Sequence, residues 1–118
     1  MYFFDTYALC EIARGSSHYQ EFSQGIELTT TLVNVYELYY VLCRDNEPEL
    51  AEKFFNLLIP CCVEILPEDV KVATSIKRNG KNLSYIDALG YSVALRAGLQ
   101  FVTGDEGFRG AKNVAFIK

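Results

Sequence analysis

Short apolar segments alternate with amphipathic helical segments along the chain. Continuous apolar runs of this length are typical of buried strands in parallel sheets. We expect strands at 2–4, 26–29, 62–66, 101–103 and 114–117. Strands that alternate with helices form a parallel sheet whose right-handed crossovers place helices on both faces. The sequence therefore predicts an α/β fold of three α/β/α layers, doubly wound, with a mainly parallel sheet of about five strands.

Capping residues and helix breakers limit the expected helices. The pattern predicts helices over roughly 6–13, 32–44, 49–58, 68–78 and 85–97. Pro48 suits the first turn of the third helix. Ser84 suits the N-cap of the last helix, with an acid three positions later at Asp87, and Gly98 suits its C-terminal cap.

Length and composition indicate one domain over residues 1–118. Half of the 118 residues are hydrophobic, which is enough for a packed core, and single cores commonly reach this size. No apolar stretch approaches the roughly 20 residues of a membrane span, and no basic and apolar leader is recognisable. We therefore expect a cytoplasmic protein without a membrane segment.

Charge and cysteine content narrow the function classes. The net charge of −4 argues against a protein that coats nucleic acid, because phosphate contacts need many basic side chains. An acidic metal site that attacks nucleic acid is compatible with it. The four cysteines form no C-x-x-C pair, and we expect buried free thiols at Cys10, Cys43, Cys61 and Cys62.

Two aspartates follow expected strands at opposite ends of the chain. Asp5 ends the run "MYFFD", and Asp105 follows "QFVTG". Ligands of doubly wound folds bind beyond the carboxyl ends of the strands, where the strand order reverses. If the two strands are neighbours there, the carboxylates approach each other, and like charges at close range need a cation or a proton.

Two further acids interrupt apolar helix faces. Glu37 stands in "LVNVYELYYVL" and Asp87 in "SYIDALGYSVAL". Oxygen ligands without histidine or cysteine suit Mg²⁺ or Mn²⁺ rather than zinc. Ordinary structural roles stay open for single residues: Asp87 as a capping-box acid, Glu37 as a partly exposed helix residue and Asp5 as a turn residue.

The chain resembles the PIN domain family, and within it the VapC-type toxins. The resemblance is carried, in order, by "FFDTYALCEI", "TTTLVNVYELYYVL", "LSYIDALGYSVALRAG" and "FVTGDEGF". It implies that the four acidic positions of the family fall on Asp5, Glu37, Asp87 and Asp105. It also places the family's hydroxyl residue at Thr103, two positions before the last acid.

The resemblance implies a metal-dependent endoribonuclease. The four acids would hold Mg²⁺ or Mn²⁺ for hydrolysis of RNA phosphodiester bonds, with Thr103 orienting a carboxylate or a water. The implied partners are an antitoxin protein and a second copy in a homodimer. Two other interpretations stay open: a non-catalytic PIN-like binding module, and a nuclease of RNA maturation.

One position departs from the family pattern. The family often has another acid two residues after the last aspartate, where this chain has Gly107. The neighbouring Glu106 is a candidate substitute. The departure bears on a second metal ion rather than on the primary site.

Basic residues near the expected site are candidate RNA contacts. Lys77, Arg78 and Lys81 lie in "IKRNGKN" before the Asp87 helix, while Arg109 and Lys112 follow the last acid. A solvated loop is the alternative role for both groups.

Histidine and tyrosine complete the candidates. The only histidine, His18, has no visible nucleophile or base partner, and we expect it at the surface. Three tyrosines on one helix, Tyr36, Tyr39 and Tyr40, suggest an interface for a second copy or another partner.

Overall fold

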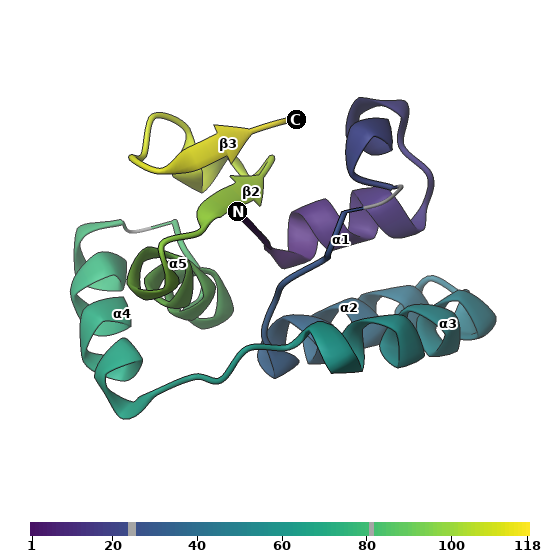
Figure 1. The fold of residues 1–118 in the computed structure, drawn as a ribbon, viewed down its shortest axis with the longest axis horizontal. Helices are drawn as coiled ribbons and strands as arrows, with labels where there is room; N and C mark the ends of the chain where they lie inside the picture. The colour runs from purple at the N-terminus through teal and green to yellow at the C-terminus, as the bar shows by residue number, and fades with distance from the viewer. Residues whose placement is uncertain (24–25, 81) are drawn as a thin grey trace.

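A small sheet stands between groups of helices (Figure 1). The computed structural model describes residues 1–23, 26–80 and 82–118. In chain order the elements are β1 (Tyr2–Phe4), α1 (Thr6–Ala13), the 3₁₀ helix η1 (Ser17–Phe22), α2 (Leu32–Arg44), α3 (Pro48–Leu58), the 3₁₀ helix η2 (Ile59–Cys61), α4 (Pro67–Asn79), α5 (Tyr85–Ala97), β2 (Gln100–Thr103), the 3₁₀ helix η3 (Glu106–Phe108) and β3 (Val114–Phe116).

The sheet is parallel, with β2 between β1 and β3. Phe3 pairs with Phe101, and Phe4 pairs with Val102. Because successive side chains of a strand point to opposite faces, each pair packs into a different one of two cores. The fold class predicted from the sequence is confirmed.

The expected strand count is wrong. Within the described residues the sheet has three strands, and segments 26–29 and 62–66 reach it only through isolated bridges. Thr29 bridges to Phe3, and Thr30 bridges to Cys62. Neither segment extends its pairing, because Thr31 already caps α2 and Pro67 already begins α4.

The isolated bridges still complete the order of segments across the sheet. From one edge the order is Cys62, Thr30, β1, β2 and β3, with parallel pairing throughout. Chain order therefore runs outward in both directions from the border between β1 and β2. This border is the switch point of a doubly wound sheet, where such folds bind their ligands.

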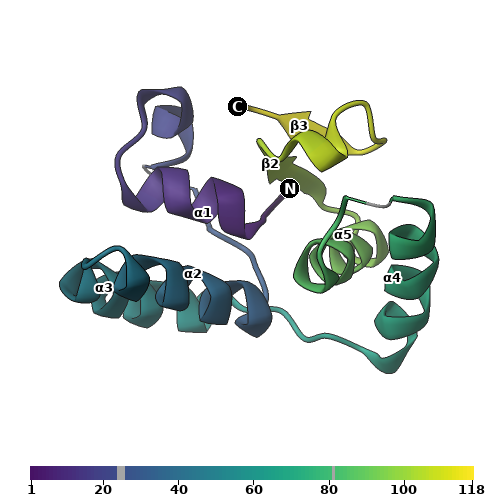
Figure 2. The same cartoon turned by 180° about the vertical axis from the view of Figure 1, so that it is seen from behind.

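Helices cover both faces of the sheet, as Figures 1 and 2 show from opposite sides. One core joins Phe4 and Val102 to α1, η1 and the antiparallel pair α2 and α3. The second core joins Phe3 and Phe101 to α5. The rings of Phe3 and Phe101 stack with their centroids 5.6 Å apart. Burial of these aromatic side chains stabilises the strand pairing at the switch point.

Local capping signals predicted the helix ends well. Helix α2 has the expected bounds, and α3 and α4 each begin one residue earlier, at a proline. Ser84 caps α5 through a capping box with Asp87, as expected. Gly98 ends α5 with φ of 69°, a left-handed conformation that glycine adopts without strain.

The cysteines are free, as expected, but the expectation that they are buried is wrong. Cys10, Cys61 and Cys62 are half-buried, and Cys43 is exposed. Cys43 lies on α2 one turn after Tyr39, which is partly buried against the core. Within residues 1–23, 26–80 and 82–118, no helix has both the length and the apolar character to cross a membrane.

A buried ion pair fastens α4 to α5. The Asp69 carboxylate is 1% exposed and accepts hydrogen bonds from Arg96 Nε at 2.9 Å and from the Leu66 N–H at 2.8 Å. Burial opposes ionisation of Asp69, but these hydrogen bonds outweigh it and hold the pKa below its usual value.

We expect Asp69→Asn to lower the free energy of unfolding by about 1–3 kcal/mol at pH 7, because Arg96 loses a charged partner. A lowered folded-state pKa stabilises above the unfolded value of about 3.9, and this stabilisation is lost as pH falls through the folded pKa. Urea unfolding of both proteins between pH 3 and 7 measures this: the difference should shrink toward pH 3. Asp45→Asn, in an exposed ion pair, is the control and should have a smaller effect. Equal effects of the two variants would contradict this role for Asp69.

Candidate active site

Asp5 lies at the switch point, directly after β1. It caps α1, its Oδ1 accepting the Ala8 N–H at 2.9 Å. Its Oδ2 accepts a hydrogen bond of 2.5 Å from Thr103 Oγ1, at the end of β2. Burial raises the pKa of Asp5 to about 7, and the negative charges of Asp87 and Asp105 act in the same direction, against the hydrogen bonds. The carboxyl is therefore held in fixed orientation at high electrostatic cost.

Thr103 connects the two aspartates that follow β1 and β2. Its hydroxyl donates to Asp5 and accepts the backbone N–H of Asp105 at 3.1 Å. The Asp105 carboxylate in turn accepts the Gly107 N–H at 2.9 Å. One buried hydroxyl thus sets the geometry of both strand ends.

Asp87 contributes a third carboxylate from the first turn of α5. Its Oδ2 accepts the Ser84 N–H at 3.0 Å, and its own N–H donates to Ser84 Oγ at 3.1 Å. The pKa of Asp87 is raised by burial first and also by Asp105 and Glu37, while the hydrogen bonds with Ser84 oppose the shift. Asp87 is therefore a capping residue that also belongs to the acidic group.

Three of the four predicted acids, Glu37, Asp87 and Asp105, line one cavity of about 410 Å³. Asp5 is 1% exposed and is not among the lining residues, although it directly precedes Thr6, which is. One side of α1 forms a wall. The complete lining is Thr6, Tyr7, Cys10, Glu11, Arg14, Glu37, Val41, Ser84, Asp87 and Asp105. Burial raises the pKa of the Cys10 thiol to about 11, which keeps it protonated.

The donor chemistry of the cavity fits a hard divalent cation. Several carboxylates in mutual electrostatic contact need a compensating positive charge, and oxygen ligands suit Mg²⁺ or Mn²⁺. In the part of the chain that the structure describes, no three Asp, Glu, His or Cys side chains already converge on one metal position. Coordination by three of the carboxylates would therefore require side-chain movement.

Glu106 does not extend the acidic group. Its carboxylate accepts two hydrogen bonds of 2.8 Å from Arg109 and also pairs with Lys118, and these partners lower its pKa to about 2. At position 107 a Cβ would lie 2.8 Å from Leu83 Cδ2, a methyl group at the end of a flexible side chain that can rotate away.

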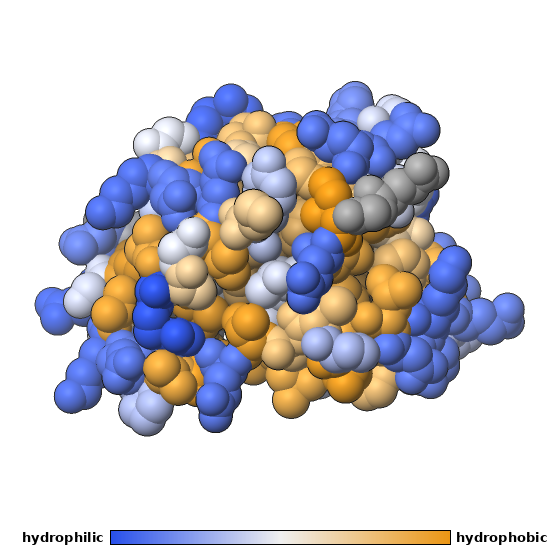
Figure 3. Space-filling view, in the orientation of Figure 1, coloured by the Kyte–Doolittle hydropathy of each residue, from blue (hydrophilic) through white to orange (hydrophobic). Residues whose placement is uncertain are grey.

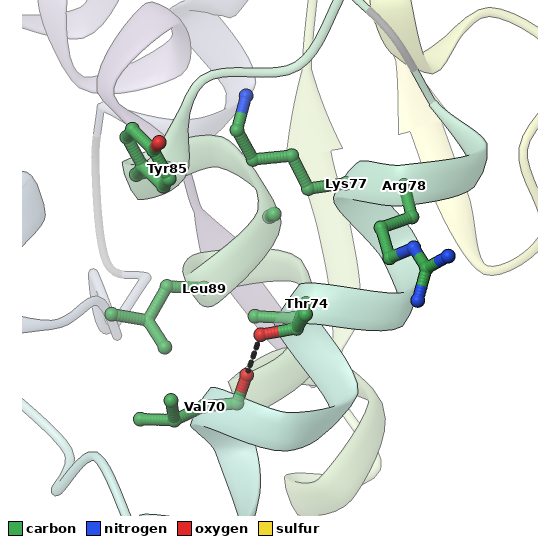
Figure 4. A pocket seen from close by; sticks show the side chains of 8 residues that line it. Val70, Thr74, Lys77, Arg78, Tyr85 and Leu89 are labelled. Atoms are coloured by element: carbon green, nitrogen blue, oxygen red, sulfur yellow. Dashed lines mark hydrogen bonds between the residues drawn. The ribbon is translucent and has the colours of Figure 1, made fainter.

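Three of the candidate RNA contacts, Lys77, Arg78 and Arg109, lie outside the acidic cavity. Lys77 donates to the Leu83 carbonyl at 2.9 Å and lies 4.6 Å from the centre of the Tyr85 ring. Lys77 and Arg78 line a separate groove of about 610 Å³ between α4 and α5 (Figure 4). Arg109 is paired with Glu106. Lys81 falls outside the described residues.

Sequence analysis missed the basic residue of the cavity. Arg14, at the end of α1, lines it and pairs with Asp45 at 2.7 Å and Glu47 at 3.3 Å. The signal available was its position one helical turn after Cys10 and two after Thr6. His18 is exposed, as expected, and its Nδ1 contacts the Lys118 carbonyl oxygen.

Comparisons with known proteins agree with the fold. A family model described as PIN domain matches residues 2–114. VapC20 of Mycobacterium tuberculosis, described as a toxin that cleaves the sarcin–ricin loop, is 16% identical, with a TM-score of 0.80 and all of both chains covered.

Two further structures are similar in fold. A toxin–antitoxin complex from Klebsiella pneumoniae is 15% identical, with a TM-score of 0.76 over 98% of this chain and 96% of that one. VapBC2 of Rickettsia felis, bound to promoter DNA, is 14% identical, with a TM-score of 0.68 over 98% and 96%. No curated protein matches the chain. At these identities the structural likeness shows the fold alone.

The site also depends on the absence of a side chain at Gly104. A Cβ there would collide with the Tyr7 ring and with the carbonyl oxygen of Ile117. We expect Gly104→Ala to lower the free energy of unfolding by about 1–3 kcal/mol, because backbone would have to move. Gly107→Ala is the control, since the Leu83 methyl that it meets can rotate away. Thermal unfolding of both variants measures this, and a Gly104→Ala protein as stable as the control would contradict the packing argument.

Proposed function

The chain belongs to the PIN domain family, and from this premise we propose that it is a divalent-metal-dependent endoribonuclease, the toxin of a VapBC-type toxin–antitoxin pair. The observation that carries the proposal is the acid-lined cavity at the switch point. Its lining carboxylates, Glu11, Glu37, Asp87 and Asp105, come from α1, α2, α5 and the segment after β2. Asp5 is connected to Asp105 through the Thr103 hydroxyl.

We assign the metal to Asp5, Glu37, Asp87 and Asp105, directly or through water. When bound there, Mg²⁺ or Mn²⁺ supplies a water of lowered pKa and compensates charge on the scissile phosphate. This accounts for an acidic protein acting on an acidic substrate. The positive charge of the cation would compensate the carboxylates and would also compensate the scissile phosphate.

The surrounding residues have positioning roles. Thr103 and the Ala8 N–H occupy both oxygens of Asp5, so this carboxyl is fixed by the scaffold before any ligand arrives. Asp87 is held in the same way by Ser84. Glu37 lies in the middle of α2 and lines the cavity with a longer side chain. Asp5 and Asp87 are thus preorganised by the scaffold, and the side-chain movement that coordination requires falls mainly to the other acids.

RNA would extend beyond the cavity onto basic residues. Lys77 and Arg78 lie on the last turn of α4, near the start of α5 where Asp87 faces the cavity (Figure 4). We propose these two residues, with Lys81 and Arg109, as phosphate contacts outside the cavity. Arg109 would have to exchange Glu106 for phosphate.

We also propose an antitoxin partner and a homodimer. Two structures of similar fold, from Klebsiella pneumoniae and Rickettsia felis, are of toxin–antitoxin proteins. Exposed apolar side chains suit association: Tyr36 is 72% exposed, and Leu32 and Val70 are exposed as well. Figure 3 shows hydrophobic side chains gathered over α4 and over the region of α2 and α3.

The nuclease proposal predicts metal-dependent cutting of RNA. Purified protein should cleave total cellular RNA with Mn²⁺ or Mg²⁺ and not with EDTA. Asp5→Asn and Asp105→Asn should each lower the rate at least about 100-fold, equivalent to roughly 3 kcal/mol of transition-state stabilisation. Circular dichroism checks that the variants fold.

Glu106→Gln is the matched control: this neighbouring acid pairs with Arg109 and Lys118, so its loss can only release basic side chains and should not lower the rate. Equal cutting by wild type and both aspartate variants would trace the activity to a contaminant. Binding of Mn²⁺ without hydrolysis of any RNA would favour the non-catalytic binding module.

The dimer proposal predicts that Tyr36→Glu dissociates the protein. Light scattering after size-exclusion chromatography should give the mass of two chains for wild type and of one chain for the variant, because a buried unpaired charge is costly. Gln20→Glu adds the same charge to an exposed position on η1 and should leave the dimer intact. A monomeric wild type, or a dimeric Tyr36→Glu, would refute this interface.

A further inference from the structure

A buried hydrogen-bond chain lies behind the acidic cavity. Asn34, on the first turn of α2, is only 1% exposed. Its Oδ1 accepts from Thr31 Oγ1 at 2.6 Å, and its Nδ2 donates to Thr6 Oγ1 at 3.2 Å. Thr6 lines the cavity and directly follows Asp5. The chain therefore connects the start of α2 to a hydroxyl beside the acidic group.

The direction of these hydrogen bonds is set by the cap of α2. Thr31 is the N-cap residue, and its Oγ1 accepts the Asn34 backbone N–H at 3.4 Å. The Thr31 hydroxyl donates to the amide oxygen of Asn34 at 2.6 Å, since an amide nitrogen cannot accept a hydrogen bond. The amide nitrogen then faces Thr6 and can only donate.

The consequence is that the Thr6 hydroxyl can donate a hydrogen bond to a ligand. The hydroxyl oxygen accepts from Asn34 Nδ2, and among the residues that the structure describes no hydrogen bond is donated by the Thr6 hydroxyl. Thr6 is 8% exposed, and its accessible side is the cavity. Carboxylates offer only acceptors to the cavity, so a neutral donor at this place differs in kind from the acids around it.

We propose that the Thr6 hydroxyl donates a hydrogen bond to a non-bridging oxygen of the RNA phosphate in the cavity, and that Asn34 is the positioning residue that directs this proton. The assignment rests on the proposed ribonuclease function, because phosphate is the acceptor that an RNA substrate brings to this place. Phosphate oxygens accept hydrogen bonds from hydroxyl groups without adding positive charge to the site.

Close packing keeps the amide in place. Helix α5 approaches the network at Gly90, where an added Cβ would lie 3.4 Å from Asn34 Oδ1 and 3.3 Å from Phe3 Cε1. The glycine therefore permits α5 to close the back of the network. A buried, satisfied polar chain of this kind restricts its members to one arrangement.

A structural role for the network, as a link between α1 and α2, is the competing explanation. It would change stability alone. A positioning role also changes what Thr6 presents to the substrate, and the two can be separated by the protein's response to paired substitutions.

The test uses Thr6→Val, Thr6→Ser, Asn34→Asp and the double variant Thr6→Val/Asn34→Asp. A carboxylate at position 34 would accept the Thr6 proton and withdraw it from the cavity. Thr6→Val and Asn34→Asp should each slow single-turnover RNA cleavage about 10- to 100-fold, the value of a hydrogen bond to a charged group. Thr6→Ser should restore cleavage to near the wild-type rate.

The double variant shows whether Asn34 acts through Thr6 or only through stability. If Asn34 acts through Thr6, the double variant should be no slower than Thr6→Val alone. Thr30→Val is the matched control: Thr30 is equally buried and donates to the Phe4 carbonyl at 2.8 Å, away from the cavity lining. It should lower the melting temperature and leave the cleavage rate unchanged. Wild-type cleavage by Thr6→Val, or a full additional loss in the double variant, would overturn the proposal.

A binding measurement keeps this result separate from the proposed function. Affinity for a 5′-phosphorylated RNA dinucleotide, with Ca²⁺ in place of Mg²⁺, should fall at least about 3-fold in Thr6→Val and stay unchanged in Thr30→Val. If wild type cleaves no RNA, the ribonuclease proposal fails, and this affinity alone decides the role of Thr6. Equal affinity in wild type and Thr6→Val would overturn it.

Discussion

The hydrogen bond between Thr103 and Asp5 is the interaction on which the site depends. These residues are 98 positions apart in the chain and meet because β1 and β2 pair in parallel with Phe4 opposite Val102. Residues just beyond the carboxyl ends of two paired parallel strands necessarily come together. The register of two short strands therefore brings the Asp5 carboxyl to Thr103, while the local cap on the Ala8 N–H holds its other oxygen. The stacked rings of Phe3 and Phe101 stabilise the same register on the sheet face opposite to Phe4 and Val102.

The acidic group lowers the stability of the folded protein, and hydrogen bonds from the backbone offset part of this loss. Burial and neighbouring negative charge raise the pKa of Asp5 and Asp87, so ionising both without a cation is unfavourable. Both carboxyls nevertheless receive backbone hydrogen bonds as caps of α1 and α5. Helix N-termini stabilise negative charge, which makes them suitable places to store it. The same two caps start the helices and hold the acids, so folding and site geometry are coupled.

Much of this arrangement could be predicted from the sequence because its signals are local. The ends of α5 are predicted by the capping box of Ser84 and Asp87 and by Gly98. The alternation of apolar runs with helical segments predicts the fold class. The segments 26–29 and 62–66 were expected to be strands, yet only Thr29, Thr30 and Cys62 make bridges. Strand extent depends on partners distant in sequence, and caps such as Thr31 compete for the same residues. Asn34 and Arg14 escaped notice because each has an ordinary local reading, at a helix start and at a helix end.

The distribution of positive charge explains why neutral donors matter here. Arg14 is paired with Asp45 and Glu47, Arg96 with Asp69, and Arg109 with Glu106. These guanidinium groups are already engaged by carboxylates, and the net charge is −4. A phosphate that enters the cavity therefore meets little uncompensated positive charge from the protein. Its charge must be balanced by a cation held by the acids, while its orientation depends on uncharged groups that donate hydrogen bonds. A hydroxyl with a directed proton can orient phosphate without competing with the acids for that cation, and Thr6 has this chemistry.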